Sequence, residues 1–175
     1  MKLDVTKMLH RVIDADWARA DAAADDDNAV LLGASGRQDN IMTAIIIKWS
    51  QGAQLAGWSQ LQKDVQVDSK SLLKTYCQCL NLMLLWAAKR QWTHLVVLDD
   101  AGWQRIERAD AAKKTVDLNK QFLTVIRLLS DVQFTHSQDS FRHAWHLMLK
   151  VILIDCGFAD HAVENCAVAL SQTKI

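Results

Sequence analysis

One polar stripe in the C-terminal half of the chain carries residue types that can bind a metal ion. The stripe has four members at helical spacing: Asp139, His143, His146 and Lys150. An acid and two histidines on one helical face can ligate a transition metal inside a helical bundle. Lys150 would repel such an ion, and the stripe is also the polar face of its own segment. We therefore keep Asp139, His143 and His146 as a weak metal candidate, behind simple solvent exposure.

The cysteines are the other residues with nucleophilic or metal-binding chemistry: Cys77, Cys79, Cys156 and Cys166. Each lies in an apolar, helix-patterned segment, where a thiol commonly acts as a small hydrophobic side chain. Cys77 and Cys79 are two residues apart, so on a helix they point to opposite sides and do not chelate one ion together. We expect reduced, structural thiols and no cofactor, and we keep a metal- or thiol-dependent enzyme as the third alternative.

Residues 58–76 resemble a degenerate helix-turn-helix motif of DNA-binding proteins. The buried positions of such a motif match at Leu61, Val65, Val67 and Leu72. Ser69, Lys70 and Lys74 would then face the DNA groove. Two positions depart from the pattern, among them Gln66, where the turn usually has glycine. A DNA-binding regulator that uses this motif is the second functional alternative.

Seven tryptophans are many for a chain of 175 residues. Tryptophan is enriched in protein interfaces, and it is also the largest core residue. Trp86 and Trp145 lie on apolar helix faces and are expected in the core. Trp58, Trp92 and Trp103 lie near helix ends or on mixed faces, so we expect them at an interface.

Composition predicts the helical scaffold that positions these residues. Half of the residues are apolar, proline is absent and only six residues are glycine, which disfavours turn-rich β architectures. Basic and acidic residues balance at 20 each, so no net field draws the chain to nucleic acid or lipid. We expect one all-α domain over residues 1–175, a bundle of about six to seven helices.

No segment is typical of a leader or a membrane span. The start of the chain is polar, and the longest strongly apolar stretch is the short run 147–154. A helix that crosses a bilayer needs about 20 apolar residues. We therefore expect a cytoplasmic protein without membrane contact.

Hydrophobic periodicity predicts helices at 4–22, 40–57, 69–91, 94–112, 117–131, 139–156 and 160–171. Aspartate outnumbers glutamate 18 to two, and an aspartate precedes or begins five of these segments: Asp39, Asp68, Asp117, Asp139 and Asp160. A short carboxylate at that position caps free backbone N–H groups. Residues 23–39 are expected to form a flexible loop, and the run 95–98 also fits a short strand.

The segment 82–88 is apolar on every side, which is typical of a central helix or a subunit interface. Together with the tryptophans it favours a non-catalytic protein–protein interaction module. Such a module is an adaptor, an accessory subunit or a homo-oligomer. We expect no catalytic residue, and a protein partner or self-association.

Overall fold

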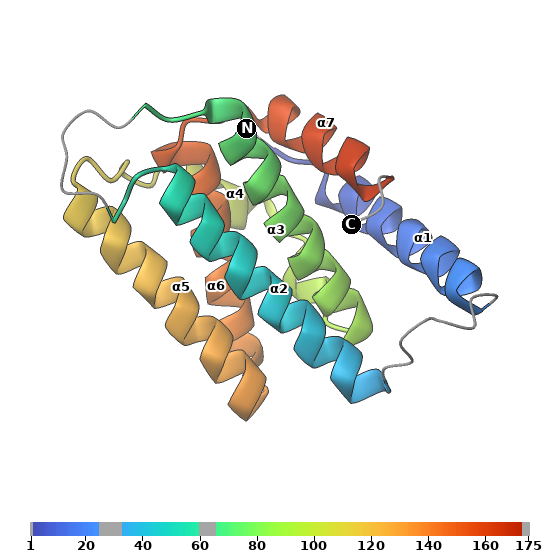
Figure 1. Cartoon of the computed structure of the whole chain (residues 1–175). Helices are drawn as coiled ribbons and strands as arrows, with labels where there is room; N and C mark the ends of the chain where they lie inside the picture. Colours follow the sequence, from blue (N-terminus) through green and yellow to red (C-terminus); the bar gives the residue numbers. More distant parts are fainter. Residues whose placement is uncertain (1, 25–32, 60–65, 173–175) are drawn as a thin grey trace.

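The computed structural model describes residues 2–24, 33–59 and 66–172, and within these ranges it contains helices and no strands (Figure 1). The prediction of an all-α bundle is confirmed. The α-helices are α1 (Val5–Ala24), α2 (Ala34–Leu55), α3 (Ser69–Lys89), α4 (Asp100–Glu107), α5 (Thr115–Thr135), α6 (Gln138–Lys150) and α7 (Asp160–Ser171). A 3-10 turn at Thr93–Leu95 and a π-helical turn at Val151–Asp155 complete the described elements.

Helix α3 is the central helix, because α1, α2 and α7 all pack against it. Every residue from 79 to 87 is buried, which explains why the second half of this helix lacks a polar face. The polar exception, Asn81, donates its Nδ2 hydrogen to the carbonyl of Ala167 on α7, at 2.8 Å. Helix α5 packs against α6 and α2 and completes the other side of the bundle (Figure 1).

Six of the seven tryptophans are buried in the core, and this corrects our expectation for three of them. Trp58, Trp92 and Trp103 are 6%, 9% and 4% exposed. Trp58 packs edge-on against Trp49, and Trp92 packs edge-on against Trp86. These side chains therefore leave little surface for another chain.

Two helix ends explain the burial of Trp58 and Trp92. At the end of α2, Gly57 has a φ of 71°, and the Trp58 N–H donates back to the Ala53 carbonyl at 3.1 Å. At the end of α3, Gln91 has a φ of 59°, and the Trp92 N–H donates to the Ala87 carbonyl at 2.8 Å. Each end is a Schellman motif, in which the residue after the left-handed position folds back onto its own helix.

Two predicted boundaries are wrong. Helix α2 begins at Ala34, so residues 34–39 are helical rather than part of a loop, while residues 25–32 lie outside the described part. The helix predicted at 94–112 is reduced to α4, Asp100–Glu107, and the run 95–98 is neither strand nor α-helix. Asp99 accepts a hydrogen bond from the Gly102 N–H at 2.7 Å and starts α4 there.

The five aspartates predicted as caps have mixed outcomes. Asp68 caps α3 by accepting from the backbone N–H groups of Lys70 and Ser71. Asp117, Asp139 and Asp160 instead lie inside the first turns of α5, α6 and α7, where a carboxylate still favours the positive end of the helix dipole. Asp39 lies within α2.

Candidate functional site

A groove of about 320 Å³ is lined by residues of α1, α2 and α3. Its apolar lining comes from all three helices: Ala20 of α1, Ile41 and Ala44 of α2, Leu82 and Leu85 of α3. The alanines are short, so the two outer helices leave space above the leucines of α3. The groove floor thus belongs to the segment of α3 that is apolar on every side.

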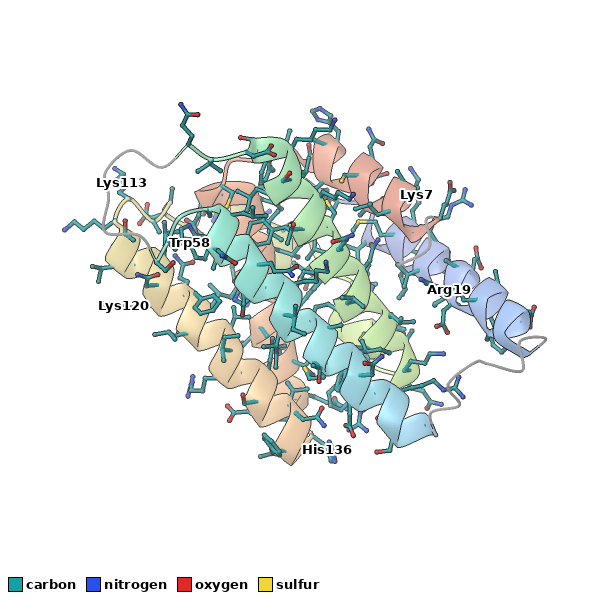
Figure 2. All side chains as sticks on the ribbon, in the orientation of Figure 1. Lys7, Arg19, Trp58, Lys113, Lys120 and His136 are labelled. Atoms are coloured by element: carbon teal, nitrogen blue, oxygen red, sulfur yellow. The ribbon has the colours of Figure 1, made fainter. Side chains whose placement is uncertain are left out.

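The rim of the groove is mostly basic. It contains three cations, Arg19, Arg37 and Lys89, and one carboxylate, Asp16. Lys89 forms an ion pair with Asp16, and the Nε of Arg19 donates to the Ala15 carbonyl at 3.1 Å. Arg19 lies on α1 at the right of the molecule in Figure 2.

A second, polar cavity of about 290 Å³ lies where α2 begins and where α3 and α5 end. Its lining residues are Ser35, Gln38, Asp39, Trp86, Arg90, Gln133 and His136. A third hollow has lining residues in common with both: Arg37 and Lys89 with the groove, and Gln38 with the cavity. We call the groove, the hollow and the cavity together the basic recess.

Arg90 dominates the cavity and is held by neutral groups. Its Nη1 donates to the Gln38 side-chain oxygen at 3.0 Å, and its Nη2 lies 2.6 Å from the His136 Nδ1. Its guanidinium carbon also lies 5.3 Å from the ring centres of both Trp86 and Trp92. Within ranges 2–24, 33–59 and 66–172, no carboxylate lies within ion-pair distance of Arg90.

The backbone of His136 places its ring against Arg90. His136 ends α5 with a φ of 56°, a left-handed conformation that terminates the helix. Because a guanidinium only donates hydrogen bonds, the Nδ1 of His136 must accept, and Nε2 then carries the ring hydrogen. Figure 2 shows His136 at the end of α5, far from Lys113 and Trp58 at the opposite end of the bundle.

The indole N–H of Trp86 is an unusual feature of this cavity. Trp86 is 1% exposed and lines the cavity, yet its Nε1 has no hydrogen-bond partner among the described residues. A buried donor without a partner costs about 1–3 kcal/mol and calls for an explanation, such as a ligand acceptor. The guanidinium of Arg90 makes the cavity rich in donors, and one oxygen of the Asp39 side chain accepts a hydrogen bond from Gln133 at 2.7 Å.

A different polar cluster lies near the opposite end of α5. The Lys150 ammonium donates to Asp155 Oδ1 at 2.7 Å and to Gln121 at 3.3 Å. The Asp155 side chain is fully buried, and the same Oδ1 accepts from the Ala112 backbone N–H at 2.6 Å. The Lys150 charge is therefore neutralised inside the protein.

The predicted metal candidates are not assembled into a site. Asp139 accepts from Arg142 at 2.8 Å, and His143 is exposed. His146 is half-buried, and its pKa is lowered first by burial and then by the positive charge of Arg105. In the part of the chain that the structure describes, no group of three or more histidine, cysteine, aspartate or glutamate side chains could hold an ion.

The predicted DNA-reading residues lie on the surface. Ser69, Lys70 and Lys74 are exposed in the first turns of α3. Residues 60–65 of the motif lie outside the described ranges, and residues 56–59 form a turn rather than the start of a helix. Since α3 continues to Lys89 as the central core helix, DNA binding stays a prediction without added support.

Sequence reasoning missed two features of the recess region. Trp17 is the exposed tryptophan, at 68%, and it lies on α1 between the groove residues Asp16 and Ala20. Its position outside the buried stripe of Val5, Met8, Leu9 and Val12 was a signal for exposure. The convergence of Arg90 and His136 had no signal in the sequence, because these residues are on different helices.

No protein-family model matches the chain, and no curated protein or solved structure shows significant similarity to it. Among the described helices, none is both long enough and apolar enough to cross a bilayer. The geometry of the recess is therefore the basis for a functional proposal.

Proposed function

We propose that the protein is a non-catalytic interaction module that binds an acidic, amphipathic helical segment of a partner protein in the basic recess. One observation carries this proposal. An apolar groove and a donor-rich cavity both lie at the C-terminal end of α3, and the hydrogen-bond partners of the arginine in the cavity are an amide and an imidazole. This combination suits apolar side chains beside a carboxylate. Recognition of an amphipathic helix by an apolar groove is a recurrent mode of peptide binding.

The apolar contribution would come from the groove and its edge. Side chains at helical spacing on the partner would pack on Leu82 and Leu85, between Ala20 and Ala44. Trp17 follows the groove residue Asp16 on α1 and offers a large, exposed aromatic side chain. Tryptophan is enriched among the residues that dominate binding energy in interfaces.

The charge of the recess selects an acidic partner. The recess contains four cations, Arg19, Arg37, Lys89 and Arg90, and two carboxylates, Asp16 and Asp39. The whole chain, in contrast, has a net charge of zero. Complementary charge of this kind favours the correct partner and raises the association rate.

A pair of synthetic peptides tests the proposal. The first is a fluorescein-labelled amphipathic helix with leucines on one face and glutamates on the other, and the second has lysines in place of the glutamates. Fluorescence anisotropy should show that the protein binds the acidic peptide and that added salt weakens this binding. Equal binding of both peptides, or binding of neither, would refute the proposal.

Two variants locate the binding surface. Ala20→Trp places a large side chain at an exposed groove position and should weaken binding of the acidic peptide about tenfold or more, the size expected for the loss of a central contact. Phe134→Ala is the matched control, because Phe134 is an exposed aromatic residue on α5, at 84%, outside the recess. It should bind like the unchanged protein. If light scattering shows a dimer that Ala20→Trp abolishes, the recess binds a second copy of the chain instead.

A further inference from the structure

The outer face of α5 carries exposed apolar side chains along most of the length of the helix. Three of its residues are large, apolar and exposed: Val116 at 61%, Leu123 at 62% and Phe134 at 84%. Helix α5 packs against α6 and α2, and it lies at one edge of the molecule (Figure 1). We call Val116, Leu123 and Phe134 together the α5 stripe.

The three side chains of the α5 stripe lie on one line. Successive residues of an α-helix are rotated by about 100°, so Leu123 returns to within about 20° of Val116, and Phe134 follows Val116 by about five full turns. Gln133, which lines the polar cavity, is about 100° away from this line. Apolar residues scattered singly over a surface are ordinary, whereas a contiguous apolar patch marks an interaction surface.

Three charged residues accompany the α5 stripe. Lys120 and Arg127 are exposed between its apolar members, and the half-buried Asp131 lies shortly before Phe134. Lys120 and Asp131 are rotated by about 20° from each other, so they lie on the same side of the stripe. Figure 2 shows Lys120 at the outer edge of α5. Within the described ranges, neither Lys120 nor Asp131 forms an ion pair.

These positions are symmetric about the middle of the helix. The midpoint of Val116 and Phe134 is residue 125, and the midpoint of Lys120 and Asp131 lies between residues 125 and 126. A twofold axis between two antiparallel helices requires this arrangement, because residue i of one copy then meets residue j of the other, and j meets i. Such an axis also keeps each side chain on its own side of the contact, so that the lysine meets the aspartate.

We propose that the α5 stripe binds the α5 stripe of a second copy of the chain, in an antiparallel, twofold-symmetric dimer. At each end of the contact, Phe134 packs on Val116 of the partner subunit. The two Leu123 side chains meet near the axis. On one side of the stripe, Lys120 pairs with Asp131 of the partner subunit, and symmetry repeats this pair.

The dimer is weak for two reasons. A contact between single helix faces is small, below about 1,200 Å² in total, the range of transient complexes. The two Arg127 side chains also approach each other near the axis, and like charges across an interface oppose association. We therefore expect a dimer that dissociates on dilution.

This dimer is separate from the recess proposal. The groove is lined by residues of α1, α2 and α3 and by none of α5, so each copy in the dimer keeps its groove. Failure of peptide binding leaves the α5 dimer standing, and a monomeric protein that binds the acidic peptide leaves the recess standing.

Sedimentation velocity of the full chain, at concentrations up to about 1 mM, tests the contact. The sedimentation coefficient should rise with concentration toward that of a dimer. Phe134→Asp places a carboxylate against Val116 of the partner subunit and should raise the dimer Kd at least about tenfold. Trp17→Asp is the matched control, because it makes the same change at an exposed aromatic residue of α1, and it should dimerise like the unchanged protein.

Three results of this experiment would overturn the proposal. They are a monomer at every concentration, a dimer that Phe134→Asp does not weaken, and a dimer that Trp17→Asp abolishes. Circular dichroism confirms that each variant keeps its helices.

Charge reversal tests the antiparallel pairing. Lys120→Asp alone and Asp131→Lys alone each place like charges opposite each other, so each should raise the dimer Kd about tenfold. The two changes combined restore opposite charges at the same positions and should return the Kd to within about threefold of the original value. A double variant that dimerises no better than the single variants would overturn the pairing.

Discussion

Arg90 and Lys150 lie toward opposite ends of the bundle, and their partners differ. Arg90 contacts His136 at the end of α5, whereas Lys150 contacts Gln121 in the first half of that helix. Lys150 is paired with the fully buried carboxylate of Asp155. Arg90 is held by an amide oxygen, an imidazole nitrogen and two indole faces.

The local backbone explains why Lys150 finds its carboxylate. Side chains five residues apart diverge by about 140° on an α-helix. The turn Val151–Asp155 is π-helical, and the wider turn brings Asp155 back over Lys150. The Lys150 end therefore has a buried cation paired with a carboxylate, whereas the hydrogen-bond partners of Arg90 among the described residues are an amide and an imidazole.

The largest effect should follow from breaking the pair at the Lys150 end. Lys150→Met leaves Asp155 buried without its cation, and we expect a loss of about 3–5 kcal/mol of unfolding free energy. Urea titration measures this loss. Replacing both partners, as in Lys150→Met with Asp155→Leu, should recover much of the lost unfolding free energy. If Lys150→Met alone lowers the unfolding free energy by less than about 1 kcal/mol, Asp155 reaches solvent and the prediction is wrong.

Tight packing at the same end predicts a smaller effect. A Cβ at Gly52 would overlap the ring of Tyr76, which is fully buried beside Cys156. Gly52→Ala should therefore cost about 1–3 kcal/mol, as overpacked cores do. In thermal melts, the double variant Gly52→Ala with Tyr76→Leu should regain part of the melting temperature that Gly52→Ala loses, because the smaller leucine makes room for the new Cβ. An unchanged melting temperature for Gly52→Ala alone would contradict this packing.

The Arg90 end should tolerate loss of its cation better than the Lys150 end does. Arg90→Met keeps an apolar side chain over Trp86 and Trp92 and removes the cation–π contacts, which are worth about 0.5–1 kcal/mol each at accessible sites. We expect a cost of about 1–2 kcal/mol by urea titration. A loss as large as that of Lys150→Met would make Arg90 a structural residue and remove the difference between the ends.

The smallest change in stability is expected at Trp17. Its side chain is 68% exposed, so Trp17→Ala should alter the unfolding free energy by no more than about 0.5 kcal/mol. The same variant should weaken binding of the acidic peptide, because Trp17 is an exposed aromatic residue next to the groove residue Asp16 in the sequence. Unchanged peptide affinity would restrict the binding surface to the groove itself.

Local patterns predicted the fold well. The periodicity of α3 and the aspartate before it predicted a helix from residue 69, and its apolar second half predicted a central position. These features depend on residues close in sequence. The helix at 94–112 was wrong because Asp99 caps a new helix in the middle of that segment.

The site was harder to predict, because it depends on residues that only the tertiary fold brings together. Gly57 before Trp58 is a local signal for a fold-back that buries the tryptophan, but Gln91 before Trp92 is not, since glutamine seldom adopts a left-handed conformation. Arg90, Gln38 and His136 come from three helices, and no spacing in the sequence relates them.

The most direct test of the recess is a double-mutant cycle between Arg90→Met and the acidic peptide. One glutamate of the peptide is replaced by glutamine at each position in turn, and Kd is measured by anisotropy for all four combinations. The account predicts one position at which the two changes are coupled by about 1.5 kcal/mol or more, as for close charge pairs across an interface. Strictly additive effects at every position would show that Arg90 does not receive a carboxylate of the bound segment.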